Sequence, residues 1–208
     1  MDQDITNMFK EKNKEIFKNS LTLEMERNLE TLKNTTDNCV ALEINKLFLF
    51  FKSFFQEINI TYKKEELLGL LYRERKTLND IINSKIDEKM TRLKEEFLKQ
   101  NESNKILTKE YLNNYFEKLK EESSIINDQI ELLLKEEICT KFSQSIISKY
   151  KLNNESYLER INSRINILFK NNIIYKVTEQ INFRDESLKN MAFESFCKYE
   201  SLNKSTIE

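Results

Sequence analysis

The side chains that could carry out acid–base or metal chemistry are few in kind in this chain. Its 208 residues include no histidine, which removes the commonest general base, the commonest metal ligand and every Ser–His or Cys–His pair. The single glycine, Gly69, cannot build either common phosphate-binding loop. A site made only of aspartates and glutamates stays possible, but many glutamates occur as adjacent pairs typical of solvated helix faces: Glu65-Glu66, Glu95-Glu96, Glu121-Glu122 and Glu136-Glu137. We therefore expect no enzyme, and no catalytic, cofactor-binding or metal-binding residues.

The three cysteines are Cys39, Cys139 and Cys197, an odd number spread far apart in apolar surroundings. No C-x-x-C motif occurs, so reduced, buried thiols in an intracellular protein are favoured. The first ten residues lack the apolar region of a signal peptide, and no stretch reaches the ~20 apolar residues of a transmembrane helix. We expect a cytoplasmic protein without a transmembrane segment.

Arg75 stands out among the charged residues because it interrupts a regular apolar row that includes Leu71, Leu78 and Ile82. Its stem could pack on the row while its head reaches a glutamate or the surface. Alternatively, it is the anchor of a protein interface, where arginine is enriched. Glu137 interrupts another row in the same way, and an Arg75–Glu137 pair would fix the register of two long helices.

The segment Cys39–Tyr62 holds five of the fourteen phenylalanines and the densest apolar run of the chain. Its apolar side chains cover a broad arc of one helix face, and the alternation of a strand does not fit. Such a face predicts either a central core helix or a helix whose aromatic groove binds another chain. We assign Phe48, Phe51, Phe55 and Arg75 as candidate partner-binding residues.

Two long helices are predicted after this segment. Apolar residues at helical spacing place one helix over about 62–100 and the other over about 109–150, with the polar residues 100–105 as a loop between them. Near Glu137 the apolar row of the second helix rotates to almost the opposite face. The helix is expected to change its packing partner or to break there.

The two ends of the chain are also predicted to be helical. A first helix is expected over 3–34, and the cap-preferring residues 34–38 either end it or lie within one long helix from about 25 to 58. A short helix after the loop at 152–154 is interrupted at Asn171-Asn172. Residues 173–200 form the last helix, with a strand over 173–183 as a minor alternative.

Together these patterns predict an all-α fold. Proline is absent and no Asn-Gly pair occurs, so tight β-turns are not expected. We expect an elongated antiparallel bundle of five to six helices, two of them long. The bundle is expected to form a single domain over 1–208, with a possible division into 1–105 and 106–208.

Residues 65–101 contain LLYRERKTLNDIIN followed by RLKEEFLKQN. This segment resembles the helical middle domain of guanylate-binding proteins and atlastins. The resemblance covers under a fifth of the chain, the two blocks lie closer together here, and the GTPase domain of those proteins is missing. The resemblance implies that this segment is helical. It also implies, as one alternative function, an accessory role in membrane remodelling.

Charge balance bears on the choice of partner. Charged residues make up 33% of the chain, yet the net charge is only −1, and each cluster of Lys and Arg is adjacent to glutamates. The composition therefore argues against a surface that binds along nucleic-acid phosphates. The expected function is a non-enzymatic scaffold or adaptor that binds protein partners, homo-oligomers included, through helix faces. A nucleic-acid-associated accessory protein for replication or segregation is the alternative.

Overall fold

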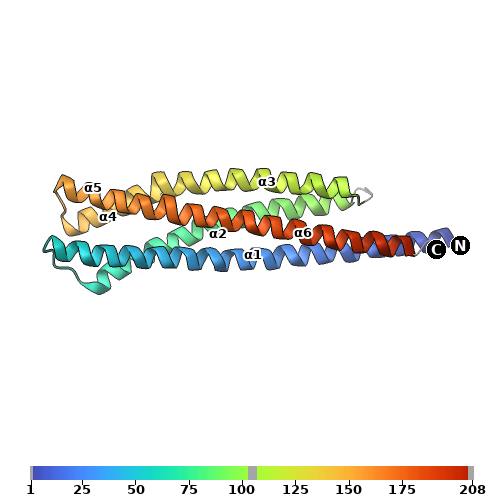
Figure 1. Cartoon of the computed structure of the whole chain (residues 1–208), viewed down its shortest axis with the longest axis horizontal. Coiled ribbons are helices and arrows are strands. Elements are labelled where there is room, and N and C mark those ends of the chain that lie inside the picture. The colour runs from blue at the N-terminus through green and yellow to red at the C-terminus, as the bar shows by residue number, and fades with distance from the viewer. Residues whose placement is uncertain (1, 103–106, 206–208) are drawn as a thin grey trace. The chain divides into compact units, whose positions relative to one another are not determined.

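The computed structural model describes residues 2–102 and 107–205, and this part of the chain is helical except at short connections. The elements are α1 (Asp2–Glu57), α2 (Lys64–Glu102), α3 (Lys109–Leu132), the π-helix η1 (Leu133–Ile138), α4 (Cys139–Tyr150), α5 (Glu155–Asn166), the π-helix η2 (Ile167–Ile174) and α6 (Tyr175–Ser205) (Figure 1). Because α3, η1 and α4 follow one another without a break, as do α5, η2 and α6, the described residues form four continuous helices. The prediction of an all-α fold is confirmed, and the count of five to six helices is wrong.

The phase change near Glu137 and the interruption predicted at Asn171-Asn172 both fall in π-helices, and the helix continues through each. Buried residues recur at every fourth position on both sides of η1: Ile126, Ile130, Leu134, Ile138, Phe142 and Ile146. A four-residue step drifts by about 40° per repeat in an α-helix. The i→i+5 bonding of a π-helix places more residues in each turn, so η1 turns the row back toward the interior.

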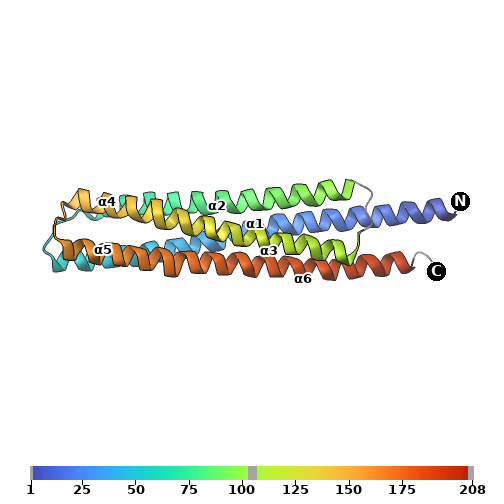
Figure 2. The same ribbon diagram turned by 90° about the horizontal axis from the view of Figure 1, so that it is seen from above.

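The same arrangement occurs around η2. Buried residues again recur at every fourth position: Ile161, Ile165, Phe169, Ile173, Val177 and Ile181. The interruption predicted at Asn171-Asn172 lies inside η2, and Figure 2 shows α5, η2 and α6 as one continuous run. A strand over 173–183 is wrong, because these residues are helical.

Residues 34–38 lie within α1, so the longer of the two predicted helices is present. The cap-preferring side chains form other hydrogen bonds here. The hydroxyl of Thr36, which is buried, donates to the carbonyl of Lys33 over 2.9 Å. Asp37 accepts hydrogen bonds from Arg75 and Asn79 of α2. Tertiary contacts thus keep in a helix a segment whose local preference is for a turn.

Two of the chain reversals use left-handed residues without glycine. Asn59 has a φ of 56° and Lys151 a φ of 51°. In each case the next amide bonds five residues back, from Ile60 to Phe55 over 2.9 Å and from Leu152 to Ile147 over 3.0 Å. This is the bonding of a Schellman helix end. These two helices therefore end with non-glycine residues in the left-handed region, at a small conformational cost that glycine would avoid.

The contacts divide the chain into two compact units, each built from parts of all four helices. Unit 1 comprises Met1–Leu32, Asp87–Ser123 and Ile181–Glu208, and unit 2 comprises Lys33–Ile86 and Ser124–Gln180. The predicted single domain, and its possible division at 105/106, stays a prediction. In the described part of the chain, no helix is sufficiently long and apolar to cross a membrane.

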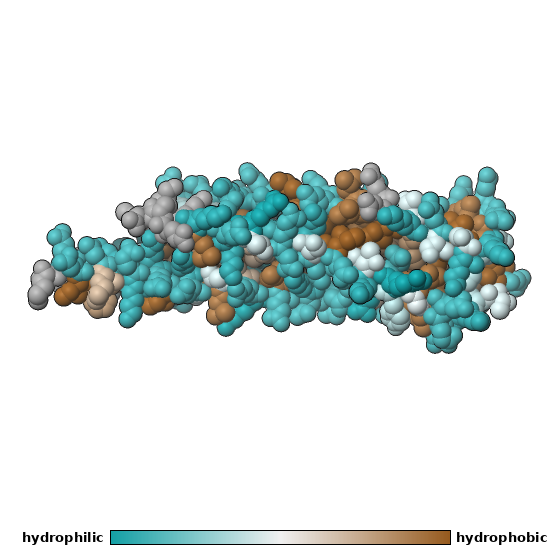
Figure 3. All heavy atoms as spheres, turned by 180° about the vertical axis from the view of Figure 1, so that it is seen from behind, coloured by the Kyte–Doolittle hydropathy of each residue, from teal (hydrophilic) through white to brown (hydrophobic). Residues whose placement is uncertain are grey.

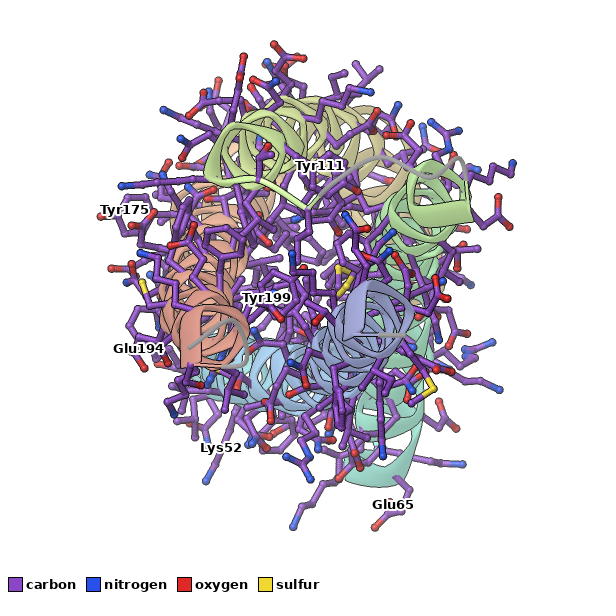
Figure 4. All side chains as sticks on the ribbon, turned by 90° about the vertical axis from the view of Figure 1, so that its right-hand side faces the viewer. Lys52, Glu65, Tyr111, Tyr175, Glu194 and Tyr199 are labelled. Atoms are coloured by element: carbon purple, nitrogen blue, oxygen red, sulfur yellow. The ribbon has the colours of Figure 1, made fainter. Side chains whose placement is uncertain are left out.

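In unit 1, α1 and α6 run in opposite directions. The amide of Asn13 donates to Asn203 over 3.0 Å, and the amide of Asn28 donates to the carbonyl of Arg184 over 3.3 Å. Seen end-on, Tyr199 lies toward the interior of this unit and Glu194 points away (Figure 4). The large buried side chains of unit 1 are Phe17, Met25, Phe97, Tyr115, Phe116 and Phe196.

In unit 2, the aromatic end of α1 lies at the centre of the hydrophobic interior. The ring of Phe51 meets that of Phe142 edge-on at 6.3 Å, and Phe142 lies 6.3 Å from Phe169. The ring of Phe55 lies 4.5 Å from that of Tyr150. These aromatic contacts connect α1, α4 and η2.

Candidate functional site

The structure places the candidate partner-binding phenylalanines in unit 2. Phe51 and Phe55 are completely buried among the aromatic rings of this unit, whereas Phe48 is partly exposed. Burial within the chain itself gives Phe51 and Phe55 a role in the hydrophobic core. Their role in binding a partner stays a prediction.

Arg75 is half-buried and pairs with an acidic residue of α1. Its guanidinium donates to both carboxylate oxygens of Asp37, at 3.2 Å and 3.0 Å. The alternative in which the stem packs and the head reaches an acidic group therefore agrees with the geometry. The side chain of Glu137, the other partner considered for Arg75, lies outside the described residues.

A buried polar cluster in unit 1 was not foreseen from the sequence. It consists of Lys89 of α2, Ser123 of α3 and Asp185 of α6, and we call it the Lys89 cluster. The ammonium of Lys89 donates to the hydroxyl of Ser123 over 2.6 Å and to Asp185 over 2.5 Å. The hydroxyl of Ser123 also lies within hydrogen-bond distance of Asp185 and of the carbonyl of Leu119. The cluster therefore links three helices through one lysine head.

Burial dominates the electrostatics of the Lys89 cluster. It lowers the pKa of Lys89 despite the attraction of Asp185. It raises the pKa of Asp185 despite the charge and hydrogen bond of Lys89 and the hydrogen bond of Ser123. A serine beside a lysine is the chemical pair of some nucleophilic enzymes. Here both side chains are almost fully buried, so the geometry supports a structural role.

A second buried charge lies in unit 2 and forms the Glu43 cluster, which consists of Glu43, Lys46, Asn172 and Lys176. The carboxylate of Glu43 accepts from Lys46 over 2.8 Å, from Asn172 over 2.9 Å and from Lys176 over 2.8 Å. Burial alone raises the pKa of Glu43, but these donors outweigh burial and the pKa is lowered. The cluster holds α1 against η2 and the start of α6.

The three cysteines differ in environment. Cys139 is buried, and burial raises the pKa of its thiol to about 12, so it is a poor nucleophile. Cys39 is half-buried, and Cys197 is exposed. The expectation of buried thiols therefore holds for Cys139 and is wrong for Cys197.

The outer side of α1 in unit 1 carries a row of exposed apolar side chains, which we call the outer row: Ile5, Phe9, Ile16 and Leu23. At 100° per residue its centre lies about 150° from that of the buried residues of the same segment, such as Phe17 and Met25. Apolar side chains are visible on the surface near the amino-terminal end of α1 (left in Figure 3). Both rows lie in the same stretch of sequence, and only the structure shows which row is buried and which is exposed.

Two neighbouring segments of unit 2 carry excess positive charge. They are residues 42–57 of α1 and residues 157–176 of α5, η2 and the start of α6, and we call their joint exposed surface the basic face. These segments contain six basic residues, Lys46, Lys52, Arg160, Arg164, Lys170 and Lys176. They contain three acidic residues, Glu43, Glu57 and Glu159. Since the whole chain has 34 basic and 35 acidic residues, this excess is local.

The clefts in the described part of the chain include three that are open to solvent. The first is lined by charged residues of α1 between Met8 and Lys18. The second, of about 200 Å³, lies beside Met25 and Met90 in unit 1, and the third, of about 400 Å³, lies beside Asn127 and Tyr175 in unit 2. No three or more acidic or cysteine side chains gather into a metal-binding group among the residues that the structure covers.

Comparison of the chain with models of known protein families, with curated proteins and with solved structures finds no match.

Proposed function

We propose that the protein is a non-enzymatic scaffold or adaptor in the cytoplasm that binds protein partners through helix faces. Self-association through the same faces is one form of this function. The proposal includes an elongated antiparallel arrangement of the helices. The observation that carries it is the outer row on α1.

The spacing of the outer row supports this proposal. Phe9, Ile16 and Leu23 are seven residues apart, and Ile5 precedes Phe9 by four, so the row has the seven-residue period of a coiled coil. The intermediate seam positions are the polar residues Lys12 and Asn19. All four apolar side chains are exposed although the same segment has a separate buried row. An apolar row that the interior of unit 1 does not use is typical of a surface that another helix covers.

The buried charged groups also support a proposal based on the outer row, because these groups already have partners within the chain. The Lys89 cluster and the Glu43 cluster both use their charged groups to hold helices of the same chain together. Since Phe51 and Phe55 are also interior residues, the proposal rests on the outer row and not on these predicted residues.

The test compares two double variants of the full chain. Ile16→Glu/Leu23→Glu places charges in the outer row, whereas Gln3→Glu/Asn7→Glu adds the same charges at exposed polar positions on the opposite side of the same helix. Light scattering measures self-association, and affinity capture from native lysate with quantitative mass spectrometry measures other partners. We expect the outer-row variant to lose assembly or partners that the control variant keeps, with the same helical content.

A strictly monomeric wild type that captures no more than the outer-row variant would contradict the proposal. Captured proteins that are lost equally in both variants would also contradict it, because the effect would then come from charge and not from the apolar row.

The alternative function is a nucleic-acid-associated accessory protein, and the excess positive charge of the basic face favours it. Its test is a gel shift with duplex DNA at several salt concentrations, since phosphate contacts weaken steeply with salt. No shift at low salt would end this alternative. An accessory role in membrane remodelling rests on the local resemblance alone, and flotation with liposomes tests it.

A further inference from the structure

The basic face of unit 2 is held together by contacts between α1 and the segment from α5 to α6. Phe54 and Tyr157 meet edge-on at 5.8 Å. Arg160 donates to both oxygens of Glu57, at 2.7 Å and 2.8 Å. These contacts place the two helical segments side by side, so that their exposed side chains form one continuous surface.

Large apolar side chains are exposed along this face. Leu42 is 50% exposed and Leu49 is 61% exposed on α1, and Ile167 is 42% exposed in η2. Tyr175, at the start of α6, is 63% exposed and points away from the helices (Figure 4), but it lines the cleft beside Asn127 of α3 and does not belong to this face. A surface that binds only phosphates does not need exposed apolar side chains such as Leu42, Leu49 and Ile167. These residues therefore indicate a partner that has apolar groups of its own.

Arg164 is the residue of this face whose contacts are incomplete. Its guanidinium lies over the ring of Phe50, 5.7 Å from the ring centre. Among the described residues no carboxylate pairs with it, and its Nε is buried without a hydrogen-bond partner. Arg160, one turn earlier, has both a ring beneath it and a bidentate carboxylate. The comparison shows what Arg164 lacks: an acidic group in front of the guanidinium.

An arginine stacked on an aromatic ring and bordered by leucine and isoleucine has the composition of an interface hot spot. A carboxylate supplied from outside would form charge-assisted hydrogen bonds with the guanidinium. Without Lys170, which lines the cleft beside Asp128 and Glu131 of α3, the two segments hold five basic and three acidic residues, and this excess makes an acidic partner electrostatically complementary.

We propose that the basic face binds an acidic amphipathic helix of a partner protein, with a carboxylate at Arg164 and apolar side chains against Leu49 and Ile167. This inference rests on the proposed function in one respect, that the protein binds protein partners. It concerns a different surface from the outer row. A protein helix is favoured over nucleic acid because the exposed apolar residues need apolar groups opposite them.

The experiment uses the full chain and a fluorescein-labelled probe peptide of about five helical turns, with a leucine seam flanked by glutamates. Fluorescence anisotropy measures its binding to the wild type, to Arg164→Glu and to Leu49→Glu. Arg73→Glu is the matched control, since Arg73 is an exposed arginine on α2 of the same unit. We expect binding about tenfold or more weaker for the two face variants, and unchanged for the control.

Two further probes separate recognition from general charge attraction. A scrambled peptide of the same composition should bind weakly to the wild type, because its leucines no longer form a seam. A peptide with lysine in place of glutamate should bind Arg164→Glu better than it binds the wild type. Circular dichroism melts of both face variants show whether they remain folded, and Leu49→Glu keeps the test valid if Arg164→Glu is unstable.

Equal binding of the probe to the wild type and to folded Leu49→Glu would overturn the inference, as would equal binding of the scrambled peptide. Binding of duplex DNA without binding of the acidic peptide would also overturn it, in favour of the nucleic-acid alternative. The outer-row variant Ile16→Glu/Leu23→Glu should bind the peptide like the wild type. Failure of the scaffold proposal and failure of this inference therefore give different results.

Discussion

Unit 1 and unit 2 each bury a charged side chain, but they surround it in different ways. Lys89 in unit 1 is 1% exposed and meets one carboxylate, from Asp185, and one hydroxyl, from Ser123. Glu43 in unit 2 is also 1% exposed, but three donors point at its carboxylate. Two of those donors are lysines whose side chains remain 43% and 36% exposed.

The pKa directions show what this difference means for the energy of each cluster. In the Lys89 cluster burial lowers the pKa of the lysine and raises that of the aspartate, so the surroundings disfavour both charges. In the Glu43 cluster the donors outweigh burial, so the surroundings favour the charge. A buried charge is therefore costly or stabilising according to how many partners it has and whether those partners reach water.

The largest effect is expected for Asp185→Asn. This change leaves the ammonium of Lys89 buried without an opposite charge, and removing one partner of a buried pair costs about 3–5 kcal/mol. We expect a loss of this size in the free energy of unfolding, measured by urea denaturation at pH 7.

The double variant Lys89→Met/Asp185→Leu is the control for Asp185→Asn. Replacing both charges by apolar groups of similar size is often nearly neutral, so its stability should lie within about 1 kcal/mol of the wild type. A double variant as unstable as Asp185→Asn would show that packing, and not the unpaired charge, causes the loss.

A smaller effect is expected for Glu43→Gln, the matched amide substitution in unit 2. Glutamine keeps one acceptor oxygen but removes the negative charge and the second oxygen. Lys46 and Lys176 can turn toward water, so a loss of about 1–3 kcal/mol is expected. The same urea experiment measures it. If Glu43→Gln destabilised the protein as much as Asp185→Asn, exposure of the partners would not explain the difference between the two units.

The smallest effect is expected for the pH dependence of the stability difference between the wild type and Glu43→Gln. Because the pKa of Glu43 in the folded state lies below its ordinary value of 4.5, its contribution is fully present above that value. The contribution is lost as the pH falls through the lowered pKa. The stability difference between wild type and Glu43→Gln should therefore shrink in acid, which urea denaturation from pH 7 to below pH 4 measures. A difference that stays constant or grows over this range would contradict the lowered pKa.

Much of the helical structure could be predicted from the sequence. The helices expected over about 62–100 and 109–150 correspond to Lys64–Glu102 and Lys109–Tyr150. Their apolar rows are long and regular, and local periodicity is what such predictions read. The break predicted at Asn171-Asn172 is wrong, because these residues lie within η2. At Glu137 a break or a change of packing partner was expected, and the helix continues through η1. A phase change in an apolar row looks the same whether the helix ends or changes to π-helical bonding.

The candidate residues were harder to predict. Arg75 attracted attention as a charge within an apolar row, but Lys89 has the same property, since it falls between Ile82, Ile86, Leu93 and Phe97 at helical spacing. That signal was available in the sequence and was missed. Arg164 gave no such signal, because its importance depends on Phe50, a residue of another helix.

The sequence by itself determined that the chain is helical and which kinds of chemistry its side chains could offer, because both depend on local spacing and residue type. Only the tertiary structure decided which apolar row of α1 is buried and which is exposed. It also decided that Lys89, Ser123 and Asp185 meet, and that Arg164 lacks the carboxylate that Arg160 has. These outcomes depend on the packing of helices far apart in the sequence, and no local pattern records which side chains that packing brings together.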